Sequence, residues 1–245
     1  MTLEGKSALV TGGARRVGRQ IALALARRGM NVAVHYNRSR ADAAALAREL
    51  ARAHGVRAVA LRAELSNARA CAALAGEAAR RLGGLHAVVN NASLWEPNRF
   101  GKTSESDWDR HMDVNARAPF FLAQAAAPHL KRAGGCIVNI ADWAAHRPYA
   151  DYIPYCVSKA ALLCLNTALA KALAPQVRVN AVMPGPVLLP DGESAAGESG
   201  AALKRATLLK RLGSPADVAK AVVFLLESDF ITGASVAVDG GRLIA

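Results

Sequence analysis

The stretch SALVTGGARRVGRQIALALARR, residues 7–28, decides the fold of this chain. Its first four residues form a short, mostly apolar run, which predicts a buried strand of a parallel sheet. The glycine-rich loop TGGARRVG follows at residues 11–18, and a helical pattern runs over residues 20–28. This order of strand, glycine-rich turn and helix suits a dinucleotide, because glycines let the backbone approach a pyrophosphate and the helix N-terminus supplies free N–H groups.

The rest of the chain continues the alternation of strands and helices. Further strands are expected at residues 31–36, 56–61, 87–89, 136–140, 178–182 and 235–238, and further helices at 40–54, 67–81, 118–131, 155–174 and 215–227. The alternation predicts an α/β fold with a single Rossmann-type, doubly wound parallel sheet flanked by helices on both faces. Because no Pro/Ser-rich linker divides the 245 residues, one domain over residues 1–245 is expected.

Composition and charge narrow the range of partners. The net charge is +12, but Arg and Lys are dispersed along the predicted helices without a basic tail, so no nucleic-acid role is expected and an anionic cofactor or substrate fits better. Residues 1–6 lack the features of a signal peptide, and no apolar run approaches the roughly 20 residues that span a bilayer, so no membrane association is expected. Cys71, Cys136, Cys156 and Cys164 form neither a C-x-x-C pair nor a metal-ligand spacing, which predicts reduced thiols, no metal site and a cytoplasmic protein.

The residues suited to chemistry cluster after the predicted strands. In a doubly wound sheet, ligands bind beyond the carboxyl ends of the strands, so the loops that follow them should share one cleft. These loops are residues 11–18, 37–39, 90–93, 141–142 and 184–186. Any one of them could be an ordinary turn, but their joint placement predicts a single ligand site.

The cofactor can be inferred from charge at the end of the second strand. A cofactor with a free ribose 2′-hydroxyl usually meets an Asp or Glu there, whereas this chain reads His35-Tyr36-Asn37-Arg38-Ser39. Arg38 and Ser39 could hold a 2′-phosphate, and Arg16 could add a second cation, which favours NADPH over NADH. In the alternative interpretation, Arg38 is a solvated residue at a helix start.

Tyr155 and Lys159 lie four residues apart at the start of a predicted helix, so they share one helix face. An ammonium beside a phenol favours the phenolate, so Lys159 is expected to lower the pKa of Tyr155 toward working pH and to make the pair a proton-delivery device. Taken alone, this spacing also fits a surface tyrosine that stacks on a lysine stem.

Together these residues resemble the short-chain dehydrogenase/reductase family, nearly from end to end. Five motifs occur in the family's order: the loop 11–18, Asn90-Asn91-Ala92, Asn115, Tyr155 with Lys159, and Pro184-Gly185. The resemblance implies that Tyr155 is the acid and that Lys159 bonds the nicotinamide ribose. It also implies that Asn115 supports a bound water in a proton relay, and that Asn91 and Ala92 line the cofactor groove.

Two departures from the family pattern resemble its pteridine reductase branch, including the dihydromonapterin reductases. Arg16 stands where the family has the middle glycine of its loop, and Asp142 stands where it has a serine. Ser93 and Trp95 also match that branch. A carboxyl at position 142 can bond the N–H edge of a pterin and share proton delivery with Tyr155, and Trp95 could stack on the ring. Alternatively, Asp142 is a salt-bridged strand-end residue and Trp95 only anchors a loop.

The resemblance and the loop positions together define the expected site. Cofactor contacts are expected from Gly12, Arg15, Arg16, Val17, Gly18, His35, Tyr36, Asn37, Arg38, Ser39, Glu64, Leu65, Asn91, Ala92, Ser93, Tyr155, Lys159, Pro184 and Gly185. Substrate contacts are expected from Arg16, Ser93, Trp95, Asp142, Tyr155, Pro186 and Leu188, with weaker expectations for Tyr149, Asp151 and Tyr152. Residues 188–200 are rich in small and polar side chains, and residues around 186–210 are expected to form a substrate lid.

The leading hypothesis is therefore an NADPH-dependent reductase of a dihydropterin or dihydrofolate. Two alternatives stay open: a carbonyl reductase of the same family, acting on a 3-oxoacyl chain or another ketone, and a non-catalytic NADP-binding sensor or scaffold. The resemblance also implies a homotetramer, with the helices 118–131 and 155–174 at a subunit interface.

Overall fold

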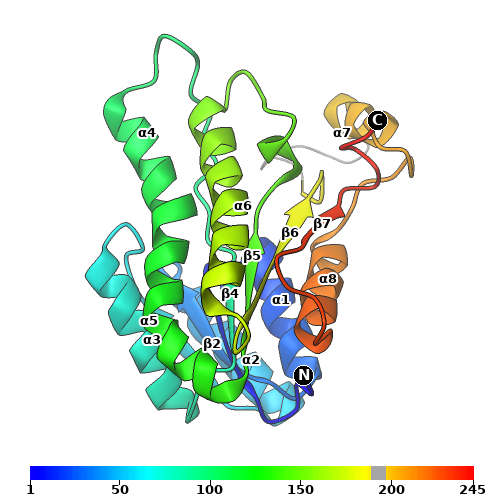
Figure 1. Ribbon diagram of the computed structural model, residues 1–245. Coiled ribbons are helices and arrows are strands. Elements are labelled where there is room, and N and C mark those ends of the chain that lie inside the picture. The colour runs from blue at the N-terminus through cyan, green and yellow to red at the C-terminus, as the bar shows by residue number, and fades with distance from the viewer. Residues whose placement is uncertain (189–196) are drawn as a thin grey trace.

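A computed structural model describes residues 1–188 and 197–245, and its centre is a parallel sheet (Figure 1). Seven strands pair in the order β3-β2-β1-β4-β5-β6-β7, and every pairing is parallel. They are β1 (Ser7–Val10), β2 (Asn31–Tyr36), β3 (Ala58–Arg62), β4 (Ala87–Asn90), β5 (Cys136–Ile140), β6 (Arg178–Pro184) and β7 (Ser235–Val238). The expected sheet is therefore confirmed.

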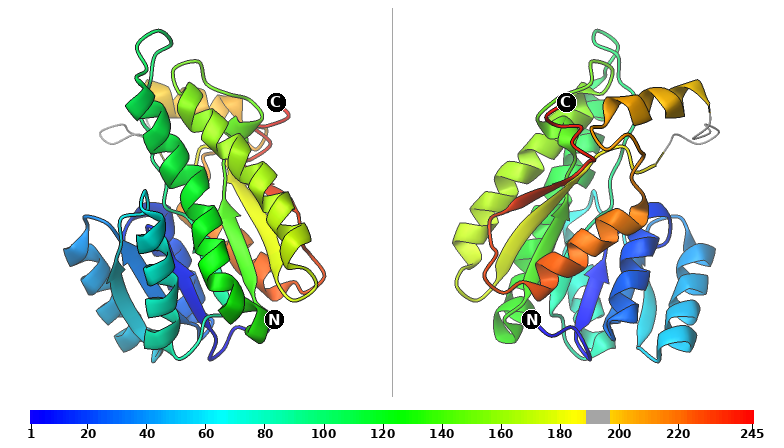
Figure 2. Two further views of the ribbon diagram at one scale, coloured as in Figure 1. Left: turned by 60° about the vertical axis from the view of Figure 1, so that its left-hand side comes forward. Right: turned by 90° about the vertical axis from the view of Figure 1, so that its right-hand side faces the viewer.

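Helices cover both faces of the sheet, as Figure 2 shows. They are α1 (Arg16–Arg27), α2 (Arg40–His54), α3 (Ala68–Leu82), α4 (Glu105–Met112), the π-helical turn η1 (Asp113–Arg117), α5 (Ala118–Ala133), the 3-10 turn η2 (Trp143–Ala145), α6 (Ile153–Leu173), α7 (Glu198–Ala206) and α8 (Pro215–Glu227). Side chains of a strand alternate between faces, so Ala8 and Val10 pack with α1, α2 and α8, while Leu9 packs with α3, α5 and α6. Two apolar cores, one on each face, hold the sheet in place.

The order of the strands places the site. Successive strands build outward from β1 to β3 on one side, and the chain then returns to place β4 beside β1 and builds outward to β7. The chain leaves β1 toward α1 on one face of the sheet and continues after β4 to α5 on the other face. The carboxyl edge at these two strands is therefore the topological switch point, which is where ligands bind in doubly wound folds.

Several element boundaries differ from the sequence expectation. Helix α1 begins at Arg16 rather than at residue 20, and β3 covers Ala58–Arg62 rather than 56–61. Helix α4 was not expected, although Ser104 and Asp107 form a capping box at its start, a signal that is present in the sequence. In the expected lid, residues 198–206 form helix α7, whereas residues 189–196 lie outside the described residues.

Helix α6 corrects one expectation about membranes. It is 21 residues long and contains an 18-residue window with a mean hydropathy of 1.4, so it could cross a bilayer by length and composition, contrary to the expectation that no run approaches that length. In this fold, however, α6 packs on the sheet through Leu169, and its polar residues Lys159 and Asn166 are buried and hydrogen-bonded to strand residues. The core helix of a soluble protein can be equally long and apolar, so the length and composition of α6 are weak evidence for a membrane span.

Candidate active site

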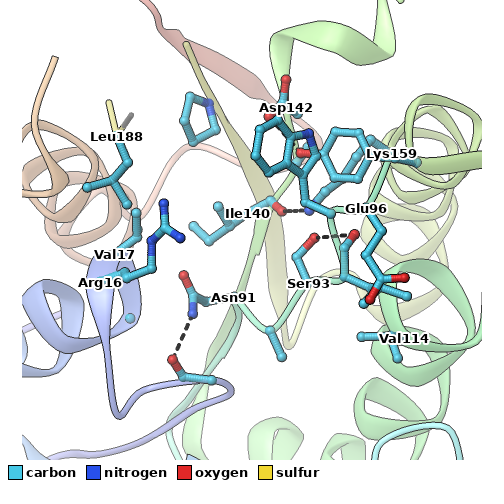
Figure 3. A pocket seen from close by; sticks show the side chains of 18 of the residues that line it. Arg16, Val17, Asn91, Ser93, Glu96, Val114, Ile140, Asp142, Lys159 and Leu188 are labelled. Atoms are coloured by element: carbon cyan, nitrogen blue, oxygen red, sulfur yellow. Dashed lines mark hydrogen bonds between the residues drawn. The ribbon is translucent and has the colours of Figure 1, made fainter. Parts of the chain in front are cut away.

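A cavity of about 1090 Å³ lies at the carboxyl edge of the sheet, and each of the strand-end loops predicted from sequence contributes to its wall. Gly12 comes from the first loop, Arg38 from the second, Asn91 from the third, Asp142 from the fourth and Gly185 from the fifth. Figure 3 shows Arg16, Val17 and Leu188 on one side of this cavity, and Glu96 and Val114 on the other. The expectation of one shared cleft is confirmed.

The glycine-rich loop packs tightly against the loop after β4. Gly12 has a φ of +58°, and a Cβ added at Gly18 would come within 2.2 Å of the Gly12 carbonyl oxygen, so neither position tolerates a side chain. Thr11 Oγ1 accepts hydrogen bonds from the backbone N–H groups of Asn91 (2.9 Å) and Ala92 (3.0 Å), and Asn91 Nδ2 donates to Thr11 O (2.8 Å). These bonds join the two loops.

The start of α1 is suited to bind an anion. Arg15, at its N-cap, makes no side-chain capping bond, and the first turn carries no acidic residue. The backbone N–H groups of the first turn and the partial positive charge of the helix end lie at the glycine-rich loop, which fits the pyrophosphate of a dinucleotide.

Arg16 occupies a backbone conformation that favours glycine. Its φ is +51°, in the left-handed region that side chains with a Cβ rarely adopt. The position is the one at which the family usually has its middle glycine, so the backbone keeps the glycine geometry while the residue adds a guanidinium. That guanidinium projects into the cavity (Figure 3).

His35 contributes to the site by holding the loop. Its Nδ1 accepts a hydrogen bond from the Gly12 N–H (3.0 Å), so the ring proton lies on Nε2, which donates to the Ala63 carbonyl (3.2 Å). Burial lowers the pKa of His35 from 6.5 to about 4, so the ring is neutral near pH 7. His35 lines the cavity as expected, but both ring nitrogens are already bonded to the main chain, so its role is to position Gly12.

The end of the cavity beside β2 and β3 mixes both signs of charge. Arg38, Asn37 and Glu64 line it, and Asn37 Nδ2 donates to Glu64 Oε2 over 2.6 Å. Burial alone would raise the pKa of Glu64, but hydrogen bonds from Asn37 and Ser66 lower it, so the carboxylate stays ionised. Arg15 also lines this end, and its Nε lies 2.6 Å from the Asp42 carboxylate.

Two expected cofactor contacts are not among the residues that line the cavity. Tyr36 packs against the apolar core on the α1 face of the sheet, and Ser39 is the N-cap of α2 without making a side-chain capping bond. Tyr36 is the last residue of β2, and strand alternation turns its side chain toward the core, whereas at Ser39 the chain turns away to start the helix.

Asp142, Tyr155 and Lys159 come together at the other end of the cavity. The Tyr155 hydroxyl donates to Asp142 Oδ2 over 2.7 Å, and Asp142 Oδ1 accepts from the Ala144 N–H at 2.8 Å. Lys159 Nζ donates to the Ile140 carbonyl over 2.8 Å and lies 5.7 Å from the centroid of the Tyr155 ring. The expected trio therefore forms one cluster, in which the phenol bonds the carboxyl rather than the ammonium.

This geometry corrects the expectation for the pKa of Tyr155. Burial, and then the charge and hydrogen bond of Asp142, raise the pKa of Tyr155 well above 10, whereas the sequence predicted that Lys159 would lower it. Burial also raises the pKa of Asp142, and burial lowers the pKa of Lys159 to about 8. The cluster thus holds a protonated phenol at neutral pH.

Asn115 lies beneath the cavity wall and does not line it. Its Oδ1 accepts from the Leu94 N–H (2.8 Å), and its Nδ2 donates to the Leu94 carbonyl (2.9 Å) and to Ser158 Oγ (2.9 Å). It sits in η1, where the helix widens between α4 and α5. In this structure the side chain fixes the segment that carries Ser93 and Trp95, and the water-relay role stays a prediction.

Aromatic rings form the outer part of the cavity. Trp95 and Tyr152 are stacked with centroids 4.9 Å apart and planes 9° from parallel, and Tyr149 contacts the edge of Tyr152. All three line the cavity, whereas Asp151 does not. Trp95 is 44% exposed, so its stacking partner Tyr152 leaves part of the indole free at the mouth.

Sequence reasoning missed several lining residues. They are Ser66, Leu94, Glu96, Arg110, Val114, Ile140 and Trp143. Ala141 belongs to a predicted loop, and Val187 and Leu203 belong to the expected lid. Most of the missed residues are neighbours of predicted ones, but Arg110 and Val114 come from α4 and η1. The capping signal at Ser104 could have located α4 in advance, although not its position beside the cavity.

Comparison with known proteins adds independent evidence. Residues 12–242 match the family model described as enoyl-(acyl carrier protein) reductase. The chain is 34% identical to the 3-oxoacyl-(acyl-carrier-protein) reductase FabG of Staphylococcus aureus, over 96% of this chain and 97% of that protein.

Solved structures are similar over the whole length. FolM alternative dihydrofolate reductase 1 from Brucella canis, complexed with NADP, superposes with a TM-score of 0.91 at 34% identity, covering 100% of this chain and 97% of that one. A blue fluorescent protein from a metagenomic library, in complex with NADPH, gives a TM-score of 0.91 at 36% identity, with 99% of both chains covered.

Proposed function

The chain belongs to the short-chain dehydrogenase/reductase family, and we propose that within it the protein is an NADPH-dependent pteridine reductase. Its substrate would be a dihydropterin, such as dihydrobiopterin or dihydromonapterin, or dihydrofolate. The observation that carries the proposal is the position of the Asp142 carboxyl. It lines the cavity, and its Oδ2 accepts a hydrogen bond from the Tyr155 hydroxyl at 2.7 Å. The similarity to FolM supports the same substrate class.

The glycine-rich loop, the start of α1 and Arg38 are suited to hold NADPH. The backbone N–H groups at the start of α1 would bind the pyrophosphate, and Arg16 and Arg38 would bind the 2′-phosphate side of the cofactor. When bound, the cofactor supplies a hydride from C4 of its nicotinamide.

The chain's own contribution is to hold and deliver a proton. Because the pKa of Tyr155 lies well above 10, the phenol carries its proton throughout the neutral range. The carbon of a pterin C=N bond accepts the hydride, and the adjacent nitrogen then becomes basic enough to take the phenolic proton. The positive charge of Lys159 would stabilise the resulting tyrosinate, and the spare lone pairs of Asp142 would hold the N–H edge of the ring.

Trp95 would provide a flat surface for the bicyclic ring. Its partly free indole lies at the mouth of the cavity and is held parallel to Tyr152. Ring stacking of this kind orients a planar heterocycle without demanding a specific hydrogen bond.

A carbonyl reductase is the second candidate, because FabG is as similar in sequence as FolM. Asp142 argues against it, since a carboxylate beside a developing alkoxide would raise its energy. A non-catalytic NADP-binding protein is the third candidate.

One assay separates the candidates. NADPH oxidation would be followed with dihydrobiopterin, dihydrofolate and an acetoacetyl thioester under the same conditions. Turnover of either pterin substrate at a kcat/KM well above that of the thioester supports the proposal. Turnover of the thioester alone makes the protein a carbonyl reductase, and NADPH binding without turnover of any of the three makes it a sensor or scaffold.

Three broader features belong to the same proposal. The chain would act as one dinucleotide-binding catalytic domain over residues 1–245, with residues around 186–210 as its substrate lid. It would work in the cytoplasm as a homotetramer. Exposed Phe120 on α5 and exposed Val157 on α6 support an interface at these helices, and light scattering of the purified protein tests the assembly.

A further inference from the structure

A second cavity, of about 340 Å³, lies at the amino edge of the sheet, where the strands begin, so it is separate from the cavity at their carboxyl ends. Lys6, which directly precedes β1, forms one part of its wall. The loop from α3 to β4 contributes His86, and the end of α5 contributes His129 and Arg132. Figure 1 shows the N-terminus at this edge of the sheet. We call this space the amino-edge cavity.

The polar side chains in the wall of the amino-edge cavity all present hydrogen-bond donors. Lys6 and Arg132 carry donors only. His86 Nδ1 accepts a hydrogen bond from the Ser7 N–H at 3.1 Å, and His129 Nδ1 accepts one from the Arg132 guanidinium at 3.0 Å. Each neutral imidazole therefore carries its proton on Nε2, and neither Nε2–H has an acceptor in the described part of the chain.

The positive charge of the amino-edge cavity has no counter-charge in the described part of the chain. No Asp or Glu from that part lines the cavity, and Lys6, Arg132 and the nearby Arg57 form no ion pair with it. A Cβ added at Gly83, in the cavity wall, would lie 3.3 Å from the Arg57 guanidinium. Burial, and then the charge of Lys6, lower the pKa of His86 below its usual value, so its ring is neutral near pH 7. A bound anion would supply the missing charge.

The ends of helices explain only some of these cations. Arg132 lies in the last turn of α5, where the partial negative charge of the helix end favours a cation. Lys6 and His86 lie outside any helix, so this explanation does not extend to them. Lys131 shares the last turn of α5 but does not line the cavity, so it shows what the helix end alone requires.

We propose that the amino-edge cavity is a second ligand site, which binds a small molecule through its phosphate groups. A phosphate carries up to two negative charges and accepts hydrogen bonds through all its free oxygens, which matches a wall of cations and N–H donors. The guanidinium of Arg132 can bond two of these oxygens at once. A volume of about 340 Å³ is at the small end of ligand cavities, which favours a diphosphate or a sugar phosphate over a whole dinucleotide.

Calorimetric titration with inorganic pyrophosphate tests the site. Saturating NADP⁺ is present, so that cofactor phosphates occupy the cavity at the carboxyl edge, and the ionic strength is low and constant because salt screens exposed charges. The wild type should bind one pyrophosphate per chain. Arg132→Gln should raise its Kd about three- to fivefold, and Lys6→Gln combined with Arg132→Gln should raise it about tenfold or more. Lys131→Gln is the matched control, which removes the same charge from the same turn and should change the Kd less than about twofold.

The outcomes of this titration decide for or against the site. One saturable pyrophosphate per chain, weakened by Arg132→Gln but not by Lys131→Gln, supports it. No saturable binding up to about 10 mM pyrophosphate overturns it. Equal effects of the two substitutions also overturn it, because the anion then responds only to the overall charge. Binding that disappears when NADP⁺ is added would place the pyrophosphate in the cofactor cavity and refute the second site. None of these results depends on pterin reduction, so the proposed function is tested separately.

Discussion

The Tyr155 hydroxyl donates a hydrogen bond to the Asp142 carboxylate over 2.7 Å, across 13 residues of sequence. Asp142 follows the carboxyl end of β5, and Tyr155 lies in the first turn of α6. Burial, and then the charge and hydrogen bond of Asp142, raise the pKa of Tyr155, so the phenol keeps its proton. The Asp142 carboxylate also gives the site a group that can hold the N–H edge of a heterocycle.

Replacement of the carboxyl tests its role directly. In Asp142→Ser, kcat for pterin reduction should fall at least about tenfold, because the ring loses a charged hydrogen-bond partner and the phenol loses its anchor. The dissociation constant of NADPH should stay within about twofold, since the glycine-rich loop is untouched. Steady-state kinetics and a fluorescence titration with NADPH measure the two quantities. Unchanged pterin turnover would refute the role assigned to Asp142.

The pH dependence of activity should report Lys159. Burial lowers its pKa to about 8, so the ammonium is lost as the pH rises through that value. The kcat/KM for pterin reduction should therefore decline above about pH 8, because a neutral Lys159 no longer stabilises a tyrosinate. The pKa of Tyr155 lies well above 10 and does not titrate in this range. A profile that stays level to pH 10 would contradict the prediction, and Lys171→Met, an exposed change on the same helix, should leave the profile unaltered.

Stability in acid should depend on His35. Its pKa is 6.5 in the unfolded chain and about 4 in the folded one, so between these values the unfolded state binds more protons. The neutral ring therefore contributes to the free energy of unfolding in full above pH 6.5. This contribution, about 3 kcal/mol in total, is lost as the pH falls toward 4. His35→Gln keeps an acceptor for the Gly12 N–H but does not titrate.

Urea unfolding of the two proteins at pH 7 and pH 4.5 measures this contribution. The free energy of unfolding of the wild type, relative to that of His35→Gln, should be about 2 kcal/mol smaller at pH 4.5 than at pH 7. The other histidines are common to both proteins and cancel in the comparison. Parallel loss of stability in the two proteins would show that His35 does not carry the effect.

Arg16 allows backbone strain to be separated from side-chain contacts. Arg16→Ala and Arg16→Gly remove the same side-chain interactions, but only glycine adopts a φ of +51° without strain. The glycine variant should therefore be more stable than the alanine variant by about 1 kcal/mol, and both should bind NADPH more weakly than the wild type. Chemical unfolding and NADPH titration of the pair provide the test. Equal stability of the two variants would mean that the left-handed conformation is not retained.

Much of the fold could be predicted because its signals are local. The apolar run Ser7–Val10, the glycine-rich loop and the helical pattern after it lie within one short segment, and the other strands show the same alternation with helices. Boundaries of β2, α2, β5, α8 and β7 coincide with those expected from sequence. Helix α4 was missed because its polar, aromatic-containing sequence shows little apolar periodicity, and it becomes a helix by its cap and by packing on α6.

The sequence by itself determined the sheet, the cleft at its carboxyl edge and the presence of Asp142, Tyr155 and Lys159 there, because periodic burial and strand topology follow from the order of residue types. Only the tertiary structure decided that Tyr155 bonds Asp142 rather than being activated by Lys159, and that Arg110 joins the cavity wall beside Trp95. Proton affinity depends on burial and on distances of a few ångströms between groups far apart in the chain. Those distances exist only once the strands and helices are packed together.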